Sequence, residues 1–336
     1  MNYNNFGRDL NKGLYFSTLK PVLNKKALFS DYTEDYVDPP EPNPYGEVTL
    51  KFRTYKSNVD HVFVICNDER YLMEKFESVD TFDYYRYTLR LDNEPVRYYF
   101  EIKGGNQTCR YDARGVVNRT EESYYFTVRP GFRTPEWAKG AVMYQIYVDR
   151  FFNGDPGNDV LTDEYNYIGE HTVHVDDWNK YPAVMGVREF YGGDLKGVMD
   201  KLDYLEGLGI DAIYFNPLFV SPSNHKYDIQ DYDYIDPHIG KIVSDEGQLL
   251  AQGDHDNKNA SRYIRRVTDR ANLEASNELF ARLVEECHKR NIRVILDGVF
   301  NHCGSFNKWL DRERIYENAE GYAKGAYVDS DSPYRN

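Results

Sequence analysis

Polar residues that could do chemistry follow an apolar run in the stretch VILDGVFNHCG, Val294 to Gly304. Asp297 stands at the end of the run, and Asn301 and His302 come a few residues later. A carboxylate and an imidazole in one place can hydrogen-bond the hydroxyl groups of a substrate or move its protons. A lone histidine usually has a structural role. The Asp-x3-Asn-His spacing at a strand end is more specific, and it indicates a site.

A second candidate site is the heptapeptide NGDPGND, which places four oxygen-bearing side chains in one tight loop: Asn153, Asp155, Asn158 and Asp159. Calcium and other hard cations bind several carboxylate and carbonyl oxygens at once. The alternative is a plain turn, because Asn-Gly, Asp-Pro and Pro-Gly are all turn dipeptides. The heptapeptide alone leaves both interpretations open.

The segment FYGGDLKG, Phe190 to Gly197, also has two interpretations. Asp194 stands just before a helical pattern, where an aspartate caps the first turn of a helix. That role explains the residue without any function. The glycine pair before it would also let a backbone carbonyl approach a cation, and Asp194 could supply a further oxygen.

The elements that would position these residues are three apolar strands alternating with two amphipathic helices. Helical spacing of apolar side chains predicts helices over 194–209, closed by Gly209, and over 276–291. The first strand is a continuous apolar run, which predicts burial on both faces. Strand–helix alternation of this kind predicts a parallel sheet. The predicted strands span 141–148, 210–219 and 292–300.

Candidate chemistry recurs where each predicted strand ends: at Asp149-Arg150, at Asn216-Pro217, and over 297–302. In a (β/α)8 barrel the carboxyl ends of the strands build the active site, so this placement is informative about where a site would lie. The loop after the second strand, 221–240, is dense in His, Tyr and Asp. Long loops over a barrel mouth are usually functional, although each of these tyrosines, taken singly, is more often a packing residue.

The N-terminal part of the chain, residues 1–130, has a different pattern. Short stretches such as EVTLKFRTY and VRYYFEIK alternate apolar and polar residues and are separated by turn residues, which predicts an all-β sandwich. A Pro- and Gly-containing linker is expected over 131–140. The 31 tyrosines suit sugar rings, which stack on flat apolar faces, but tyrosine also fills strands well.

Composition excludes several classes of partner. A formal net charge of −14 disfavours nucleic acid, and no basic face for a membrane surface is visible. The stretch MNYNNFGRDLNKGLYF lacks the apolar run of a signal peptide, so we expect a cytoplasmic protein. The four cysteines are widely spaced and form no zinc pattern, which predicts reduced thiols.

Taken together, four segments resemble the α-amylase superfamily, family 13 of the glycoside hydrolases, and most of all its neopullulanase, cyclomaltodextrinase and maltogenic amylase branch. They are VMYQIYVDRFFNGDPGND, FYGGDLKGVMDKLDYLEGLGIDAIYFNPLF, SPSNHKYDIQDYDYIDP and VILDGVFNH, and they cover most of residues 141–302. The resemblance implies three β/α units of a TIM barrel over 141–302 and the start of the excursion after the third strand, domain B, over 303–336. The N-terminal sandwich resembles the starch-binding-type, carbohydrate-binding module of that branch.

The resemblance also assigns roles to single residues. Tyr227 matches the tyrosine that stacks under the sugar at the cleavage subsite, and His302 matches the histidine that hydrogen-bonds that sugar. Asp297 matches the aspartate that orients the site, and His225 lies in the matching substrate loop. Asn301, a calcium ligand in other α-amylases, is expected to be structural here. The calcium site of the branch matches Asn153, Asp155, Asn158, Asp159, the backbone of Gly192, and Asp194.

The catalytic residues of the superfamily are not matched. Retaining hydrolysis needs a nucleophilic carboxylate and a carboxylic acid, and a third carboxylate assists them. The resemblance places all three on later barrel strands, beyond residue 336, so we expect this chain alone to be inactive. The RLD of Arg90 to Asp92 imitates the nucleophile motif but belongs to the sandwich. The charged insertion 241–270 has no predicted role.

Three functions remain open. The favoured one is the N-terminal part of an α-glucan hydrolase acting on α-1,4 and α-1,6 bonds of cyclodextrins, pullulan and starch oligosaccharides. A non-catalytic α-glucan-binding protein is the second. Glucosyl transfer is the third, since water and a sugar hydroxyl compete for the same covalent intermediate. A homodimer through the N-terminal module is an expectation by analogy.

Overall fold

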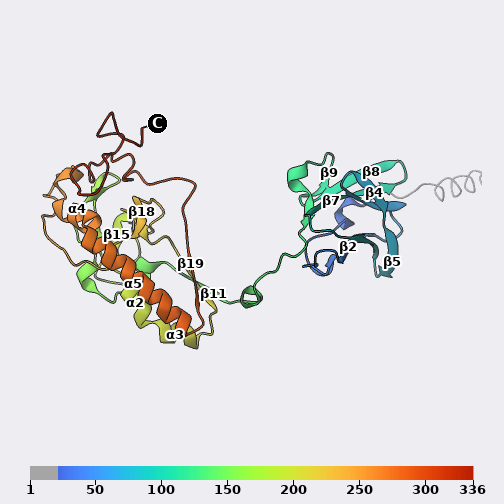
Figure 1. Ribbon diagram of the computed structural model, residues 1–336, viewed down its shortest axis with the longest axis horizontal. Coiled ribbons are helices and arrows are strands. Elements are labelled where there is room, and N and C mark those ends of the chain that lie inside the picture. The colour runs from blue at the N-terminus through green and yellow to red at the C-terminus, as the bar shows by residue number, and fades with distance from the viewer. Residues whose placement is uncertain (1–21, 336) are drawn as a thin grey trace, which may run out of the picture. The chain divides into compact units, whose positions relative to one another are not determined.

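The computed structural model describes residues 22–335, so the stretch MNYNNFGRDLNKGLYF, and the expectation attached to it, lie outside the described residues. The chain divides into two compact units between Pro135 and Glu136, within the segment where a linker is expected. Figure 1 shows one unit built of strands and one that mixes helices with strands. None of the described helices is both long enough and apolar enough to cross a membrane.

The N-terminal unit is a sandwich of two antiparallel sheets. Burial alternates along β2 (Glu47–Tyr55) and β7 (Val96–Gly104), because successive side chains of a strand point to opposite faces. Phe52 of one sheet and Phe100 of the other are fully buried, and their ring centroids lie 4.6 Å apart. In the first sheet the strand order is β1 (Val37–Asp38), β2, β6 (Phe82–Arg90), β5 (Glu74–Val79). In the second sheet the order is β4 (Glu69–Leu72), β3 (His61–Cys66), β7, β8 (Gln107–Asp112), β9 (Gly115–Val117). Strand β10 (Phe126–Val128) also pairs with β7.

The C-terminal unit is built on the parallel sheet expected from the sequence. Its strands β11 (Met143–Ile146), β16 (Ala212–Phe215) and β19 (Arg293–Leu296) lie in that order. Ile146, Phe215 and Leu296 are partners across the sheet and pack in one apolar core with the helices. The helices between the strands are α2 (Leu195–Asp200), α3 (Leu202–Gly207), α4 (Ser261–Thr268) and α5 (Arg270–Lys289).

The expectation that the first strand is buried on both faces is wrong. Tyr144 and Ile146 point into the helix-covered core, whereas Met143 is 61% exposed on the other face. The reason is positional. The strand lies at the edge of the three-stranded sheet, and among the described residues the helices contribute to a core on only one of its faces.

The helices differ from the sequence prediction at their ends. The helix expected over 194–209 is interrupted at Lys201 and forms α2 and α3, while Asp194 caps α2 as expected and accepts the N–H of Gly197. The helix expected to begin at Ser276 begins at Arg270, because Asp269 caps it by accepting the N–H of Ala271.

The remaining elements are short, and η1 and η2 lie in the N-terminal unit. The C-terminal unit contains a second apolar core, in which Tyr165, Tyr263, Phe306 and Tyr316 pack together. This core joins residues 303–335, which contain no helix or strand in their described part, to the rest of the unit. The two-stranded sheets pair β12 (Asn166–Tyr167) with β13 (Glu170–His171), β14 (Val173–His174) with β15 (Glu189–Phe190), and β17 (Phe219–Val220) with β18 (Asp231–Ile235). The 3-10 helices are η1 (Lys25–Ala27), η2 (Glu122–Tyr124), η3 (Glu136–Ala138), η4 (Val148–Arg150), η5 (Pro156–Asn158), η6 (Gly186–Arg188) and η7 (Asn257–Asn259).

Candidate functional site

Tyr227 and Asp297 come together at the carboxyl ends of neighbouring strands. The Tyr227 hydroxyl donates to Oδ2 of Asp297 over 3.0 Å. Burial and the Asp297 carboxylate raise the pKa of the Tyr227 phenol, so it stays protonated and a donor. Burial and the nearby Asp297 carboxylate also raise the pKa of Tyr214 of β16. The loop after β16 and the end of β19 therefore present an aromatic ring and a carboxylate side by side.

His225 joins this pair. Its Nδ1 accepts the backbone N–H of Tyr227 over 3.1 Å, and the two rings lie 5.9 Å apart. Burial lowers the pKa of His225, which favours the neutral ring that such an acceptor requires. Three of the four predicted sugar-binding residues thus form one cluster.

His302 is the exception. Its side chain is exposed, and Nδ1 lies 3.1 Å from the amide nitrogen of Asn301, which is also exposed. Within residues 22–335 no hydrogen bond joins the His302 ring to Tyr227 or Asp297. Its backbone is anchored instead, because the Tyr232 hydroxyl donates to the carbonyl oxygen of His302 over 2.9 Å.

The predicted cation loop is fastened to the start of α2. Oδ2 of Asp194 accepts the backbone N–H of Asp155 over 2.7 Å, and Oδ1 accepts that of Gly197 over 2.6 Å. The contact is tight, since a Cβ on Gly197 would lie 1.8 Å from the carbonyl oxygen of Phe152. Asp194 therefore holds the loop and caps the helix at once.

Two amide oxygens in the loop are buried without a hydrogen-bond partner. The Asn153 amide nitrogen donates to both oxygens of Asp159, at 2.9 and 3.1 Å, and that of Asn158 donates to the carbonyl of Gly240 over 3.0 Å. Both Oδ1 atoms are left unpaired. A Cβ on Gly192 would come within 2.5 Å of Asn153 and Asp159, so its backbone lies against this pair. Unpaired buried oxygens beside a carboxylate fit a hard cation.

Charged groups near the loop 153–159 would both favour and oppose the binding of a cation. Burial raises the pKa of Asp159 to about 6, and a bound cation would stabilise its charged form. Nζ of Lys241 lies 2.6 Å from Oδ2 of Asp155 and would compete with a cation there. No group of three or more His, Cys, Asp and Glu within residues 22–335 could hold a metal. The unpaired oxygens of Asn153 and Asn158 would therefore have to add to the carboxylates of the loop to hold a cation.

The strand-end residues Asp149 and Asn216 have supporting roles. Buried Asp149 accepts the N–H groups of Tyr191 and Gly192 at 3.0 and 3.3 Å, and so orients the glycine beside the cation loop. Asn216 accepts from the Gln145 amide over 2.7 Å. Of the two, Asp149 positions the backbone around the site.

A buried chain of charges behind Tyr227 was not predicted. Lys226 pairs with Asp236 over 2.6 Å, Asp236 with His238 over 2.9 Å, and His238 with Glu164 over 2.7 Å. Arg266 continues the chain, with 2.9 Å to Glu164. All five residues are nearly wholly buried. Buried charges need partners of opposite charge. These pairs cannot be recognised in the sequence, because Glu164 lies 74 residues from His238 and 102 from Arg266.

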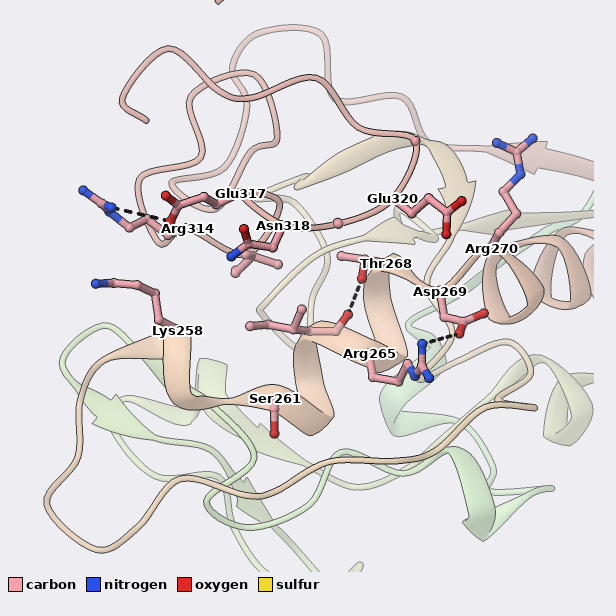
Figure 2. Close-up of a pocket in the computed structure, with 14 residues that line it drawn as sticks. Lys258, Ser261, Arg265, Thr268, Asp269, Arg270, Arg314, Glu317, Asn318 and Glu320 are labelled. Atoms are coloured by element: carbon pink, nitrogen blue, oxygen red, sulfur yellow. Dashed lines mark hydrogen bonds and ion pairs between the residues drawn. The ribbon is translucent and has the colours of Figure 1, made fainter. Parts of the chain in front are cut away.

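A cavity of about 860 Å³ lies elsewhere, between α4 and residues 314–321 (Figure 2). Its lining includes Arg265, Asp269, Arg314 and Glu317, and within this lining Arg265 pairs with Asp269 and Arg314 with Glu317. None of the predicted sugar-binding or cation-binding residues lines it.

The sequence matches two models of known families. The α-amylase catalytic domain matches residues 145–257 and 275–335, and the N-terminal Ig-like domain of α-amylases matches residues 43–130. The chain belongs to the α-amylase family. The catalytic-domain match omits residues 258–274, the segment that contains α4.

Relatives come from the branch named above. The chain is 31% identical to a cyclomaltodextrinase of Thermoanaerobacter pseudethanolicus and 37% identical to neopullulanase 2 of Thermoactinomyces vulgaris, and each alignment covers 83% of this chain and 42% of the relative. An amylopullulanase of Thermoanaerobacter thermohydrosulfuricus is 35% identical over 93% of this chain and 21% of its own length. The chain therefore spans less than half the length of each of these relatives.

Proposed function

We propose that this chain is the glucan-recognising part of a retaining glycoside hydrolase that acts on α-glucosidic bonds of cyclodextrins, pullulan and starch oligosaccharides. The observation that carries the proposal is the hydrogen bond of 3.0 Å between Tyr227 and Asp297, beyond the carboxyl ends of the parallel strands. A phenol ring offers an apolar face to the C–H face of a glucose unit, and the carboxylate accepts from its hydroxyls. The relatives named cyclomaltodextrinase and neopullulanase support α-glucans as the substrate class.

The chain on its own is proposed to bind without cleaving. Retaining hydrolysis needs two carboxyl groups about 5 Å apart across the bond. Asp297 accepts from Tyr227, and no carboxylate of another described residue hydrogen-bonds to Tyr227, Asp297 or His225. The RLD motif lies at the end of β6, in the N-terminal unit, as expected. The nucleophile and the acid would come from sequence outside these 336 residues. A purely glucan-binding protein is the second candidate, favoured by the same cluster.

Native electrophoresis in gels containing pullulan, with a parallel assay for reducing sugar, tests this function. The chain should be retarded by pullulan and release no sugar. Tyr227→Ala should abolish the retardation, whereas Tyr204→Ala, which alters a tyrosine 54% exposed on α3, should not. Sugar release, or equal retardation of both variants, would contradict the proposal.

A structural calcium ion is proposed for the loop 153–159. Oxygens of Asn153, Asp155, Asn158 and Asp159, the backbone of Gly192, and Asp194 would hold it, supported by the two unpaired amide oxygens. The ion would neutralise the buried carboxylates and stiffen the loop. Chelation should lower the melting temperature of the wild type, and Asp155→Ala should lower it by the same increment. An unchanged melting temperature after EDTA treatment would count against the site.

A cytoplasmic location is also proposed. One relative is named an intracellular maltogenic amylase of Bacillus subtilis, and all four cysteines are free. The starch-binding role and the homodimer of the N-terminal module stay predictions, which gel-filtration and starch-pulldown of residues 1–336 would test.

A further inference from the structure

Helix α4 lies in the segment that the α-amylase catalytic-domain match leaves out, and it has two distinct faces. Its outer face, with Ser261, Arg265 and Thr268, lines the cavity shown in Figure 2. Its inner face is buried through Tyr263 and Arg266, which are 1% and 2% exposed. A helix of eight residues is too short to be stable alone, so its inner contacts determine where it sits.

Arg266 connects this helix to the proposed cation loop. Its Nη1 donates to the carbonyl oxygen of Asp159, the last residue of the loop, and to Oε2 of Glu164, both over 2.9 Å. Its Nε and Nη2 donate to Asp245 over 2.7 and 3.0 Å. The guanidinium is therefore fixed on both edges, and it fixes the end of the loop in turn.

Tyr263 connects the same helix to the substrate loop. Its hydroxyl donates to Oε1 of Gln230 over 2.7 Å, three residues after Tyr227 in the chain. Its ring lies 4.0 Å from that of Tyr165 and 5.9 Å from that of His238. One helix thus contacts both loops through neighbouring residues of its inner face.

A second route runs from Arg266 through the buried charges. From Arg266 the ion pairs continue through Glu164, His238 and Asp236 in that order. The last pair joins Asp236 to Lys226, which precedes Tyr227 in the sequence. Paired charges in a dry interior move together, because separating one pair leaves an uncompensated buried charge. A shift of the loop 153–159 would therefore displace Lys226 and change the position of Tyr227.

We propose that α4 is a positioning element that couples the two loops: a divalent cation bound at 153–159 orders 221–240, and thereby Tyr227, through Arg266 and Tyr263. The inference rests on the calcium site proposed above. In this proposal the segment 258–274 links metal binding to the position of Tyr227, the residue proposed to stack on the sugar. Arg266 and Tyr263 are positioning residues, since neither lies among the predicted sugar or cation ligands.

Hydrogen–deuterium exchange of the 336-residue chain, with and without calcium chloride, tests the coupling. In the wild type, calcium should slow exchange in 153–159 and, by roughly tenfold, in 221–240. Tyr263→Phe removes only the hydroxyl that reaches Gln230, and Arg266→Lys cannot bridge Asp159, Glu164 and Asp245 at once. Both variants should keep the protection of 153–159 and lose most of the calcium-dependent protection of 221–240.

Arg262→Met is the matched control. Arg262 binds the same Asp245, over 2.9 and 2.6 Å, but contacts neither Asp159 nor Glu164, and the variant should behave as the wild type. If Arg266→Lys fails to fold, Tyr263→Phe decides. Protection confined to 153–159 in the wild type, or equal protection of 221–240 in all variants, would overturn the coupling while leaving the calcium site. Absence of any calcium effect at 153–159 would overturn both.

Discussion

The hydroxyl of Tyr227 lies 3.0 Å from Oδ2 of Asp297, although 70 residues separate them in the chain. The contact exists because β16 and β19 are neighbours in a parallel sheet, which brings their carboxyl ends to one edge. It turns two residues of unremarkable type into an aromatic surface with an adjoining hydrogen-bond acceptor.

The two halves of this contact should contribute differently to glucan affinity. Tyr227→Phe keeps the ring but removes the hydroxyl that holds Asp297 in position. Losing about 1 kcal/mol of binding free energy with that position should raise the Kd for a maltooligosaccharide about fivefold. Asp297→Asn should have a similar or larger effect, because it removes a charged acceptor. Fluorescence titration of each variant measures this. Tyr204→Phe serves as the control. If neither Tyr227→Phe nor Asp297→Asn changes the Kd, the Tyr227–Asp297 contact does not contribute to glucan binding.

The buried His238 predicts a pH dependence of stability. Burial lowers its pKa, but Glu164 and Asp236 outweigh that effect and raise it. A histidine with a raised folded-state pKa stabilises the fold fully below its unfolded value of about 6.5, and this stability is lost as the pH rises through the folded value. Urea denaturation should therefore show the free energy of unfolding falling above about pH 6.5.

His238→Gln should reduce that slope, leaving the part due to His171, whose pKa is raised by its hydrogen bonds despite burial. His288→Gln, which alters an exposed histidine of α5, should preserve the slope. The partners of His238 act in the opposite range. The pKa values of Glu164 and Asp236 are held low despite burial, so their contribution is present above about pH 4 and is lost as the pH falls further. A slope that persists unchanged in His238→Gln would show that other groups cause it.

Lys241 should weaken cation binding. Its ammonium group lies 2.6 Å from Asp155 and occupies an oxygen that a calcium ion would use. Lys241→Met should therefore lower the calcium concentration needed to raise the melting temperature, by roughly threefold to tenfold. Lys258→Met, which removes a lysine paired with Asp256, is the control. Weaker calcium binding in Lys241→Met would mean that the lysine supports the loop.

Two helical glycines should respond oppositely to alanine. A Cβ at Gly197 would lie 1.8 Å from the carbonyl of Phe152, so Gly197→Ala must displace the loop from α2 and should cost several kcal/mol of stability. Nothing lies within 4 Å of a Cβ at Gly207, and Gly207→Ala should be neutral or stabilising by up to about 1 kcal/mol. Thermal denaturation compares them. Equal melting temperatures would show that the loop does not pack against α2 as described.

Local patterns predicted much of this fold. The period-two alternation of EVTLKFRTY gave β2 over the same nine residues, and the Asp194 cap marked the start of α2. The strand ends also pointed to the edge where Tyr227 and Asp297 meet. These signals work because each depends on residues close together in the chain.

What the sequence did not reveal depends on distant partners. Met143 belongs to an apolar run yet is exposed, because burial of an edge strand depends on what covers each face. Glu164, His238 and Arg266 are ordinary polar residues until the fold pairs them across 74 and 102 positions. The start of α5 at Arg270 depends on a single cap at Asp269, which lies inside the charged insertion 241–270.

Isothermal titration of the chain with maltohexaose, and with cellohexaose as the β-linked control, tests whether Tyr227 and Asp297 form an α-glucan site. Maltohexaose alone should give heat of binding, which should be strongly reduced in Tyr227→Ala and unchanged in Tyr204→Ala. No heat with maltohexaose, or binding by Tyr227→Ala equal to that of the wild type, would contradict it.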